Sequence, residues 1–97
     1  MKYYIIHITY VVPQNEVDLV RPEHREYLKI FYDNGTLLFS GPRVPPSGGI
    51  LAARAETDEA IQSMISDDPF SRKGIATYEI VEMKPAMWAT ELAPIFS

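Results

Sequence analysis

The chain has 97 residues, a net charge of −4 and no cysteine. This length suits one domain with a single core, and the lack of cysteine excludes disulfides, thiolate nucleophiles and cysteine metal sites. The lysines and arginines are scattered, which argues against a nucleic-acid partner. No stretch reaches the roughly 18 apolar residues of a membrane span, and the N-terminus has the composition of a strand rather than a signal peptide. We therefore expect a cytoplasmic protein that binds neither membranes nor nucleic acid.

Four segments have the composition of β-strands, rich in Tyr, Ile, Val and Thr or in other apolar residues. They are residues 2–12, 36–40, 50–55 and 75–83. The first carries large residues on both faces and is expected to lie centrally in a sheet. Gly41-Pro42 is expected to end the second strand, and residues 44–49, with two prolines and two glycines, form the loop of a hairpin with the third.

The first helix is predicted over residues 21–32 from apolar side chains at helical spacing. Pro22 suits its first turn, where a missing N–H costs nothing, and Asn34 or Gly35 provides its stop. The apolar stripe begins at His24, which therefore points towards whatever the helix packs on. A histidine in that place is either a hydrogen-bonded core residue or an acid–base group, because histidine exchanges protons near neutral pH.

The second helix is predicted from a cap at Thr57 to about residue 67. Asp68 precedes Pro69 and is thereby pushed out of helical geometry. It can cap a short helix that starts at Pro69 and ends at Gly74, which is the structural interpretation. The functional alternative is that Asp68 orients the imidazole of His24, as carboxylates do in general acid–base sites.

The order of elements, β-α-β-β-α-β, predicts an α+β, ferredoxin-like fold over residues 1–97: a four-stranded antiparallel sheet with two helices on one face. The other face needs a cover, and a homodimer that packs two sheets together would supply it. The tail, residues 86–97, is too apolar to remain in solvent and is expected to dock on the domain or on a partner.

Three motifs resemble the YciI-like (YCII-related) family. They are Arg21-Pro22-Glu23-His24, Leu38-Phe39-Ser40-Gly41-Pro42, and Asp68-Pro69-Phe70 followed by Gly74. Their order and spacing extend the resemblance to about Lys84-Pro85. It implies a dimeric ferredoxin-like α/β barrel, a His–Asp pair at His24 and Asp68, and a pocket lined by Ser40 and Gly41. It also implies a fold like that of muconolactone isomerases, and one activity associated with the family is dehydrochlorination of a chlorinated hydroxyquinol.

Two further residues are candidates for substrate binding. His7, in the middle of the first strand, is either structural or pocket-lining. Arg43 follows Gly41-Pro42 and either binds an anionic substrate or is a solvated loop arginine. No metal site is expected, because the two histidines lie on different elements and the acids lack ligand spacing. No phosphate-binding glycine loop or nucleophilic serine motif is present.

Two hypotheses follow. The first is a small, cofactor-free lyase or isomerase in which His24 is the acid–base and Asp68 orients it, acting on a hydroxylated or carbonyl-bearing small molecule. The second is a non-catalytic ligand-binding or assembly domain in which His24 and Asp68 only satisfy each other. They differ in whether His24 opens into a pocket.

Overall fold

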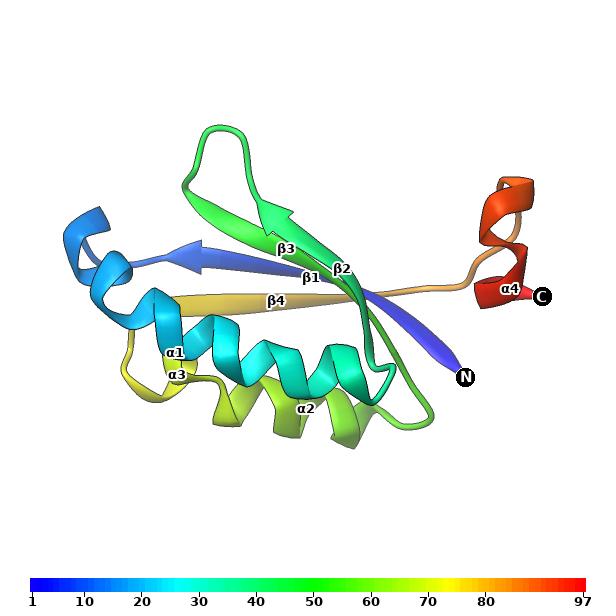
Figure 1. Cartoon of the computed structure of the whole chain (residues 1–97), viewed down its shortest axis with the longest axis horizontal. Coiled ribbons are helices and arrows are strands. Elements are labelled where there is room, and N and C mark those ends of the chain that lie inside the picture. Colours follow the sequence, from blue (N-terminus) through cyan, green and yellow to red (C-terminus); the bar gives the residue numbers. More distant parts are fainter.

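The computed structural model describes residues 1–97, as four strands and a set of helices (Figure 1). The strands are β1 (Lys2–Tyr10), β2 (Leu37–Pro42), β3 (Gly48–Ala55) and β4 (Ala76–Met83). The helices are α1 (Gln14–Asp33), α2 (Asp58–Asp67), α3 (Pro69–Arg72), the 3-10 segment η1 (Thr90–Leu92) and α4 (Ala93–Phe96). The sheet is antiparallel with the order β2-β3-β1-β4, so the first strand lies centrally, as expected. The predicted ferredoxin-like α+β fold is confirmed.

Helix α1 begins seven residues earlier than predicted, at Gln14 rather than Arg21, and Pro22 lies inside it. A proline there removes one backbone hydrogen bond and is unfavourable in a helix interior. The reason it is tolerated is the buried stripe, which continues on the N-terminal side of Pro22 with Val17 and Val20. Burial of both valines against the sheet outweighs the lost bond, and Pro22 itself faces solvent.

The β2–β3 hairpin is longer than predicted. Gly41 and Pro42 continue β2, and β3 starts at Gly48, which pairs across to Thr9 of β1. Pro42 is acceptable because β2 is an edge strand, where one N–H is not needed by a neighbour. Position 48 requires glycine because the backbones of β1 and β3 approach closely there: a Cβ would lie 1.8 Å from the carbonyl oxygen of Ile8. The glycines therefore permit close pairing of backbones rather than ending the ladder.

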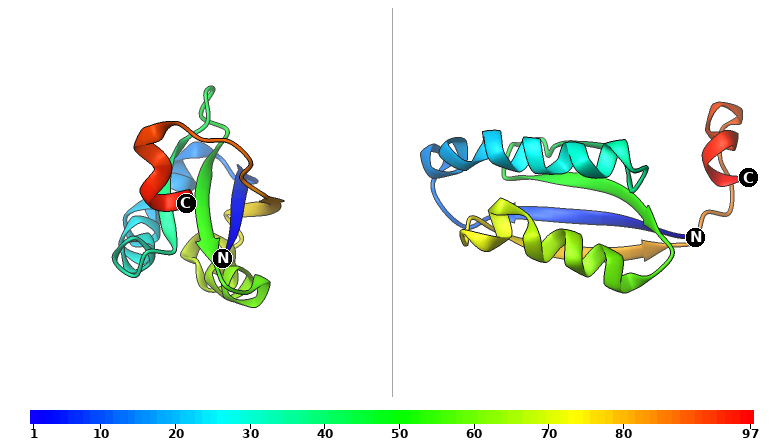
Figure 2. Two further views of the ribbon diagram at one scale, coloured as in Figure 1. Left: turned by 90° about the vertical axis from the view of Figure 1, so that its right-hand side faces the viewer. Right: turned by 60° about the horizontal axis from the view of Figure 1, so that its bottom comes forward.

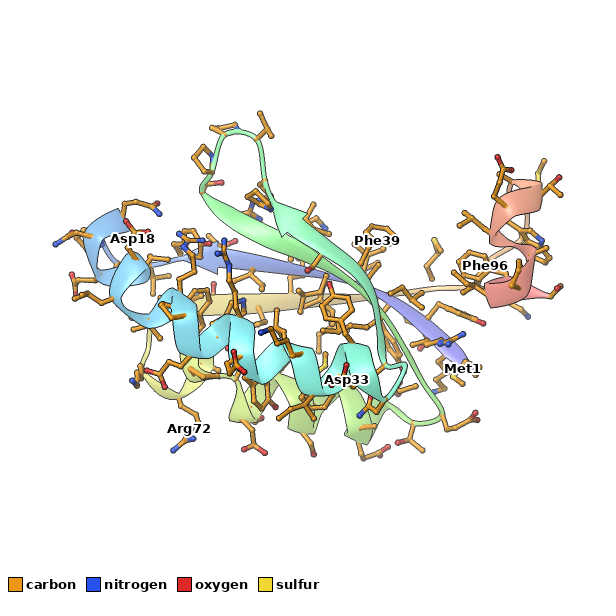
Figure 3. The ribbon with its side chains drawn as sticks, viewed as in Figure 1. Met1, Asp18, Asp33, Phe39, Arg72 and Phe96 are labelled. Carbon is orange, nitrogen blue, oxygen red and sulfur yellow. The ribbon has the colours of Figure 1, made fainter.

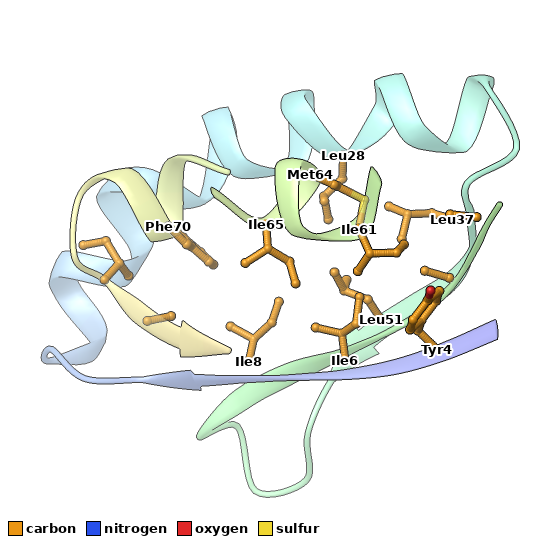
Figure 4. Close-up of a cluster of buried hydrophobic side chains, with 14 of the residues drawn as sticks. Tyr4, Ile6, Ile8, Leu28, Leu37, Leu51, Ile61, Met64, Ile65 and Phe70 are labelled. Atoms are coloured by element: carbon orange, nitrogen blue, oxygen red, sulfur yellow. The ribbon is translucent and has the colours of Figure 1, made fainter. Parts of the chain in front are cut away.

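The core lies between the sheet and helices α1, α2 and α3 (Figure 4). On β1 the alternate residues Tyr4, Ile6 and Ile8 point into it and are almost completely buried. The helices contribute Leu28, Ile61, Met64, Ile65 and Phe70. No helix combines the length and the hydropathy that a membrane span requires.

The opposite face of the sheet carries no helix of the main layer (Figure 2). Phe39 of β2 and Val81 and Met83 of β4 expose between 44% and 65% of their surface there. The tail reaches only one end of this face, where the hydroxyl of Tyr3 donates to the carbonyl of Ile95 at 2.9 Å and its ring meets Phe96 edge-on. Most of the open face is therefore left to solvent by this chain.

Candidate functional site

His24 lies on the inner face of α1, one helical turn beyond Val20, and only 8% of its surface is exposed. The helical period carries it to this place, because residues 17, 20, 24 and 28 share one stripe. At His24 the helix packs on α3, whose Phe70 ring also meets that of Tyr10 at the C-terminal end of β1. The imidazole is thus held between α1 and α3 rather than in solvent.

Asp68 joins α2 to α3 and is 2% exposed. Pro69 holds it in extended geometry, φ −62° and ψ 132°, so its side chain turns back over the first turn of α3. Its Oδ1 accepts a hydrogen bond from the backbone N–H of Phe70 at 2.9 Å and contacts Nδ1 of His24 at 2.8 Å. The structural and the functional geometry predicted for Asp68 are therefore present together.

The imidazole of His24 is fixed in three ways. Its Nδ1 contacts Asp68, its ring stacks on Phe70 with centroids 3.9 Å apart and planes at 7°, and α1 anchors its backbone. Since the carboxylate can only accept, we assign the Nδ1 proton to the histidine, which leaves a lone pair on Nε2 of the neutral ring. Nε2 has no hydrogen-bond partner within the chain and is the nitrogen available to a bound molecule.

A cavity of about 250 Å³ lies beside His24. Its walls come from α1, β1, the β2–β3 hairpin and α3. The lining residues are Ile8, Tyr10, Arg21, His24, Arg25, Leu28, Ser40, Gly41, Pro42, Gly49, Ile50, Leu51 and Phe70. Pockets that hold drug-sized ligands have volumes of about 300–1,000 Å³, so this cavity suits a smaller molecule. Its lining is mixed, with apolar side chains beside His24 and two arginines.

The structure brings Ser40 and Gly41 to this cavity, opposite His24. Ser40 is on the same face of the sheet as buried Leu51, its partner in β3, and its hydroxyl contacts that of Tyr32 on α1 at 2.5 Å. Tyr32 thereby fixes one wall of the cavity against the last turns of α1.

His7 and Arg43 are not among the lining residues. Strand alternation puts His7 on the open face, between Ile50 and Glu79, although its neighbour Ile8 lines the cavity. The guanidinium of Arg43 donates to Thr9 Oγ1 at 3.0 Å and to the Ser47 carbonyl at 3.3 Å, so it closes the hairpin loop. The structure therefore does not bring these two predicted binding residues into contact with the His24 cavity.

Two arginines of the cavity were missed in the sequence analysis. Arg21 and Arg25 lie three residues before and one after His24, and Leu28 completes the group at helical spacing. Arg21 donates to Asp18 at 3.0 Å and to the Tyr10 hydroxyl at 3.4 Å. Helical spacing could have found Arg21, which lies at i−3 from His24, but not Arg25, because adjacent residues on a helix do not face each other.

The hydroxyl of Tyr78 is buried behind Asp68. Tyr78 pairs with Ile8 across the sheet and therefore points to the helix-covered face. Burial raises the pKa of its phenol, and the negative charge of Asp68 raises that pKa further. No hydrogen bond of acceptable geometry joins the two groups, so the Tyr78 hydroxyl has no partner.

Two further contacts tie α1 to α2 and α3. The Tyr27 hydroxyl donates to the Met64 carbonyl at 2.8 Å, and Lys73 forms an exposed ion pair with Glu23. Tyr27 does not line the cavity, so its hydrogen bond supports the site without entering it. No group of three or more His, Asp or Glu side chains lies close enough together to hold a metal ion.

Comparisons with known proteins agree with this fold. The chain is 30% identical over 78 residues to a protein of Emericella nidulans named derivative of benzaldehyde biosynthesis cluster protein C. The matched region covers 64% of this chain and 80% of that protein. The structure of this chain resembles that of the 5-chloro-2-hydroxyhydroquinone dehydrochlorinase TftG of Burkholderia phenoliruptrix, which was solved in complex with 2,5-dihydroxybenzoquinone. The TM-score is 0.74 at 18% identity, over 87% of this chain and 95% of that one.

An antibiotic biosynthesis monooxygenase is a more distant structural neighbour, with a TM-score of 0.58 at 14% identity over 88% of this chain and 99% of its own. At these identities the two solved structures show the fold alone. The family model of the YCII-related domain matches residues 1–84, from the start of β1 to just past the end of β4. The protein therefore belongs to the YCII-related domain family.

Proposed function

We propose that the protein is a small acid–base enzyme, a lyase or isomerase, in which His24 moves a proton on a small hydroxylated or carbonyl-bearing molecule. The observation that carries this proposal is the buried His24–Asp68 hydrogen bond at the wall of a cavity. A positioned histidine with one nitrogen held by a carboxylate and the other free is the arrangement that proton transfer needs.

The proton would travel as follows. Nε2 of neutral His24 takes a proton from a carbon or hydroxyl of the substrate, and the Asp68 carboxylate stabilises the resulting imidazolium through Nδ1–H. In an isomerisation, Nε2 returns the proton to a different atom of the same molecule. In an elimination, the leaving group departs with its bonding electron pair and the proton passes from Nε2 to solvent. A dehydrochlorination, as in the name of the structural neighbour, is an elimination of this kind.

We also propose that a second copy of the chain covers the open face of the sheet. Three apolar side chains on that face, Phe39, Val81 and Met83, are each more than 40% exposed. A typical stable interface buries about 800 Å² on each partner, and a four-stranded sheet offers a face of this order.

The rival to the enzyme hypothesis, a non-catalytic domain, rests on the capping role of Asp68 and the stacking of His24 on Phe70, both of which are structural contacts.

Exchange of hydrogen for deuterium tests the enzyme hypothesis without knowledge of the product. A panel of small hydroxylated and carbonyl ring compounds, 5-chloro-2-hydroxyhydroquinone among them, is incubated in D₂O and followed by proton NMR, with chloride release measured in parallel. We expect His24→Asn to lower the rate by about 10²–10⁴-fold, the range that a positioned acid–base group contributes.

Tyr27→Phe is the matched control. It removes a nearby hydrogen bond between α1 and α2 but touches no part of the cavity, so it costs stability and leaves the exchange rate unchanged. A folded His24→Asn variant that is as active as the wild type would contradict the acid–base role. The non-catalytic hypothesis would then stand.

A further inference from the structure

The charges around the cavity are one-sided. Arg21 and Arg25 line it, and none of its thirteen lining residues is acidic. The chain as a whole has a net charge of −4, so this positive cluster departs from the character of the molecule. An uncompensated positive wall in a concave site attracts negative ligands, since low-dielectric walls focus the field.

Arg25 is the uncompensated member. It has neither a hydrogen bond nor a salt bridge within the chain, whereas the acids nearest to it on α1 are already engaged. Asp18 binds Arg21, Glu23 binds Lys73 and Glu26 binds Lys29. At three and four residues from Arg25 the helix carries only arginine, proline, leucine and lysine, so two of these neighbours repel it. Arg25 therefore brings to the cavity a positive charge that no ion pair within the chain neutralises.

The positive charge of Arg21 is partly neutralised by Asp18. Its guanidinium donates to Asp18 at 3.0 Å, and this hydrogen bond is the main cause that lowers the pKa of the Asp18 carboxyl. Asp18 lies on the outer side of α1, near its N-terminal end (Figure 3), and is not a lining residue. Asp18 thus neutralises part of the positive charge of Arg21 from outside the cavity.

We infer that this cavity binds an anion: a small, single-ring carboxylate or phenolate whose negative group pairs with Arg25, and with Arg21, while its ring lies among Leu28, Leu51 and Phe70. Guanidinium groups suit this partner, because their planar donors match carboxylate oxygens. The inference rests on the proposed function only in that the anion is taken to be the substrate on which His24 acts. The cavity volume of about 250 Å³ sets the size of the ligand.

The test compares benzoate with its neutral analogue benzamide, titrated into the ¹⁵N-labelled full chain by NMR. We expect wild type to bind benzoate about 10-fold more tightly than benzamide, the worth of a charge-assisted hydrogen bond. Arg25→Gln removes this preference, lowering benzoate affinity about 10-fold and leaving benzamide unchanged. Asp18→Asn acts in the opposite direction and tightens benzoate binding a few-fold, because it frees Arg21.

Arg72→Gln is the matched control, since Arg72 does not line the cavity and projects from the lower edge of the molecule in Figure 3. It leaves both affinities unchanged. The inference is overturned if wild type fails to bind benzoate at millimolar concentration, if benzamide binds as well as benzoate, or if Arg25→Gln has no more effect than Arg72→Gln.

His24→Asn separates this inference from the proposed function. If it abolishes proton exchange but retains benzoate binding within a few-fold, both claims hold. If exchange persists in His24→Asn while Arg25→Gln loses benzoate, the anion site stands and the acid–base role of His24 falls.

Discussion

The two faces of the sheet differ in what their polar groups do. The helix-covered face holds His24, Asp68 and the arginines of the cavity, while the open face presents Phe39, Val81 and Met83 to solvent. The two histidines of the chain illustrate the difference. His7 is adjacent in sequence to Ile8, a cavity residue, yet alternation along β1 directs its side chain to the other face. Strand alternation therefore accounts for the exclusion of His7 from the cavity.

This comparison separates two tasks. On the covered face most polar groups are withdrawn from water and have a partner that fixes their geometry, and the Tyr78 hydroxyl is the exception. On the open face apolar side chains remain exposed to water, so burying them favours association with another protein surface. We expect changes on the first face to alter chemistry and stability, and changes on the second to alter assembly. Four predictions test this division.

The largest effect is expected at Asp68. Asp68→Ala removes the cap of α3 and the partner of His24 and is expected to lower the free energy of unfolding by about 2–4 kcal/mol. Asp68→Asn keeps an oxygen for the Phe70 N–H but loses the charge, so it should cost about 1 kcal/mol while the exchange rate falls about 10²-fold. Denaturant unfolding and the D₂O exchange assay measure the two quantities. An Asp68→Asn variant with wild-type activity would show that Asp68 is only a cap.

Val81→Glu, on the open face, is expected to convert a dimer to a monomer without loss of fold. A charge placed at the centre of an apolar interface loses its hydration without gaining a partner. Light scattering at micromolar concentration gives the molecular mass. Ile30→Glu is the control, because it places the same charge on an apolar side chain of α1 that is 56% exposed, on the helix side of the molecule. A wild-type monomer under these conditions would end the dimer proposal.

Stability is expected to fall as pH rises above 10. Burial raises the pKa of Tyr27 to about 12 from an ordinary value of 10.0, and the pKa values of Tyr4 and Tyr78 are also raised, chiefly by burial. Because the folded state holds these protons more tightly than the unfolded state, their stabilisation is complete below pH 10 and is lost for Tyr27 between pH 10 and 12. Melting temperatures from pH 8 to 12 should show this fall, and Tyr27→Phe should reduce its slope. A flat profile would contradict the burial of these phenols.

The smallest effect is expected for Tyr78→Phe. The hydroxyl of Tyr78 is buried without a partner, so its removal should change the free energy of unfolding by less than about 0.5 kcal/mol or increase it slightly. Tyr27→Phe is the comparison, because that hydroxyl does have a partner in the Met64 carbonyl, and should cost about 1 kcal/mol. A larger loss at Tyr78 than at Tyr27 would mean that the Tyr78 hydroxyl bonds to Asp68 in solution.

The sequence alone was enough for the features that depend on neighbours in the chain. The order of strands and helices follows from hydrophobic period, and the Asp68-Pro69 pair with Gly74 specifies the short capped helix by local chemistry. Two local rules failed. Pro22 was taken as a helix start and Gly48 as a loop residue, but burial of Val17 and Val20 carried the helix through Pro22. Close approach of the Ile8 carbonyl brought Gly48 into the sheet.

Only the tertiary structure decided the contents of the site. His24 and Asp68 are 44 residues apart, and without the family motifs nothing in their local patterns would have paired them. The arginines of the cavity and the exclusion of His7 and Arg43 likewise depend on how α1 lies against the sheet and the β2–β3 hairpin. The physical reason is that periodicity assigns a side chain to a face of its own element, whereas a site forms where faces of several elements meet, and packing alone fixes that meeting.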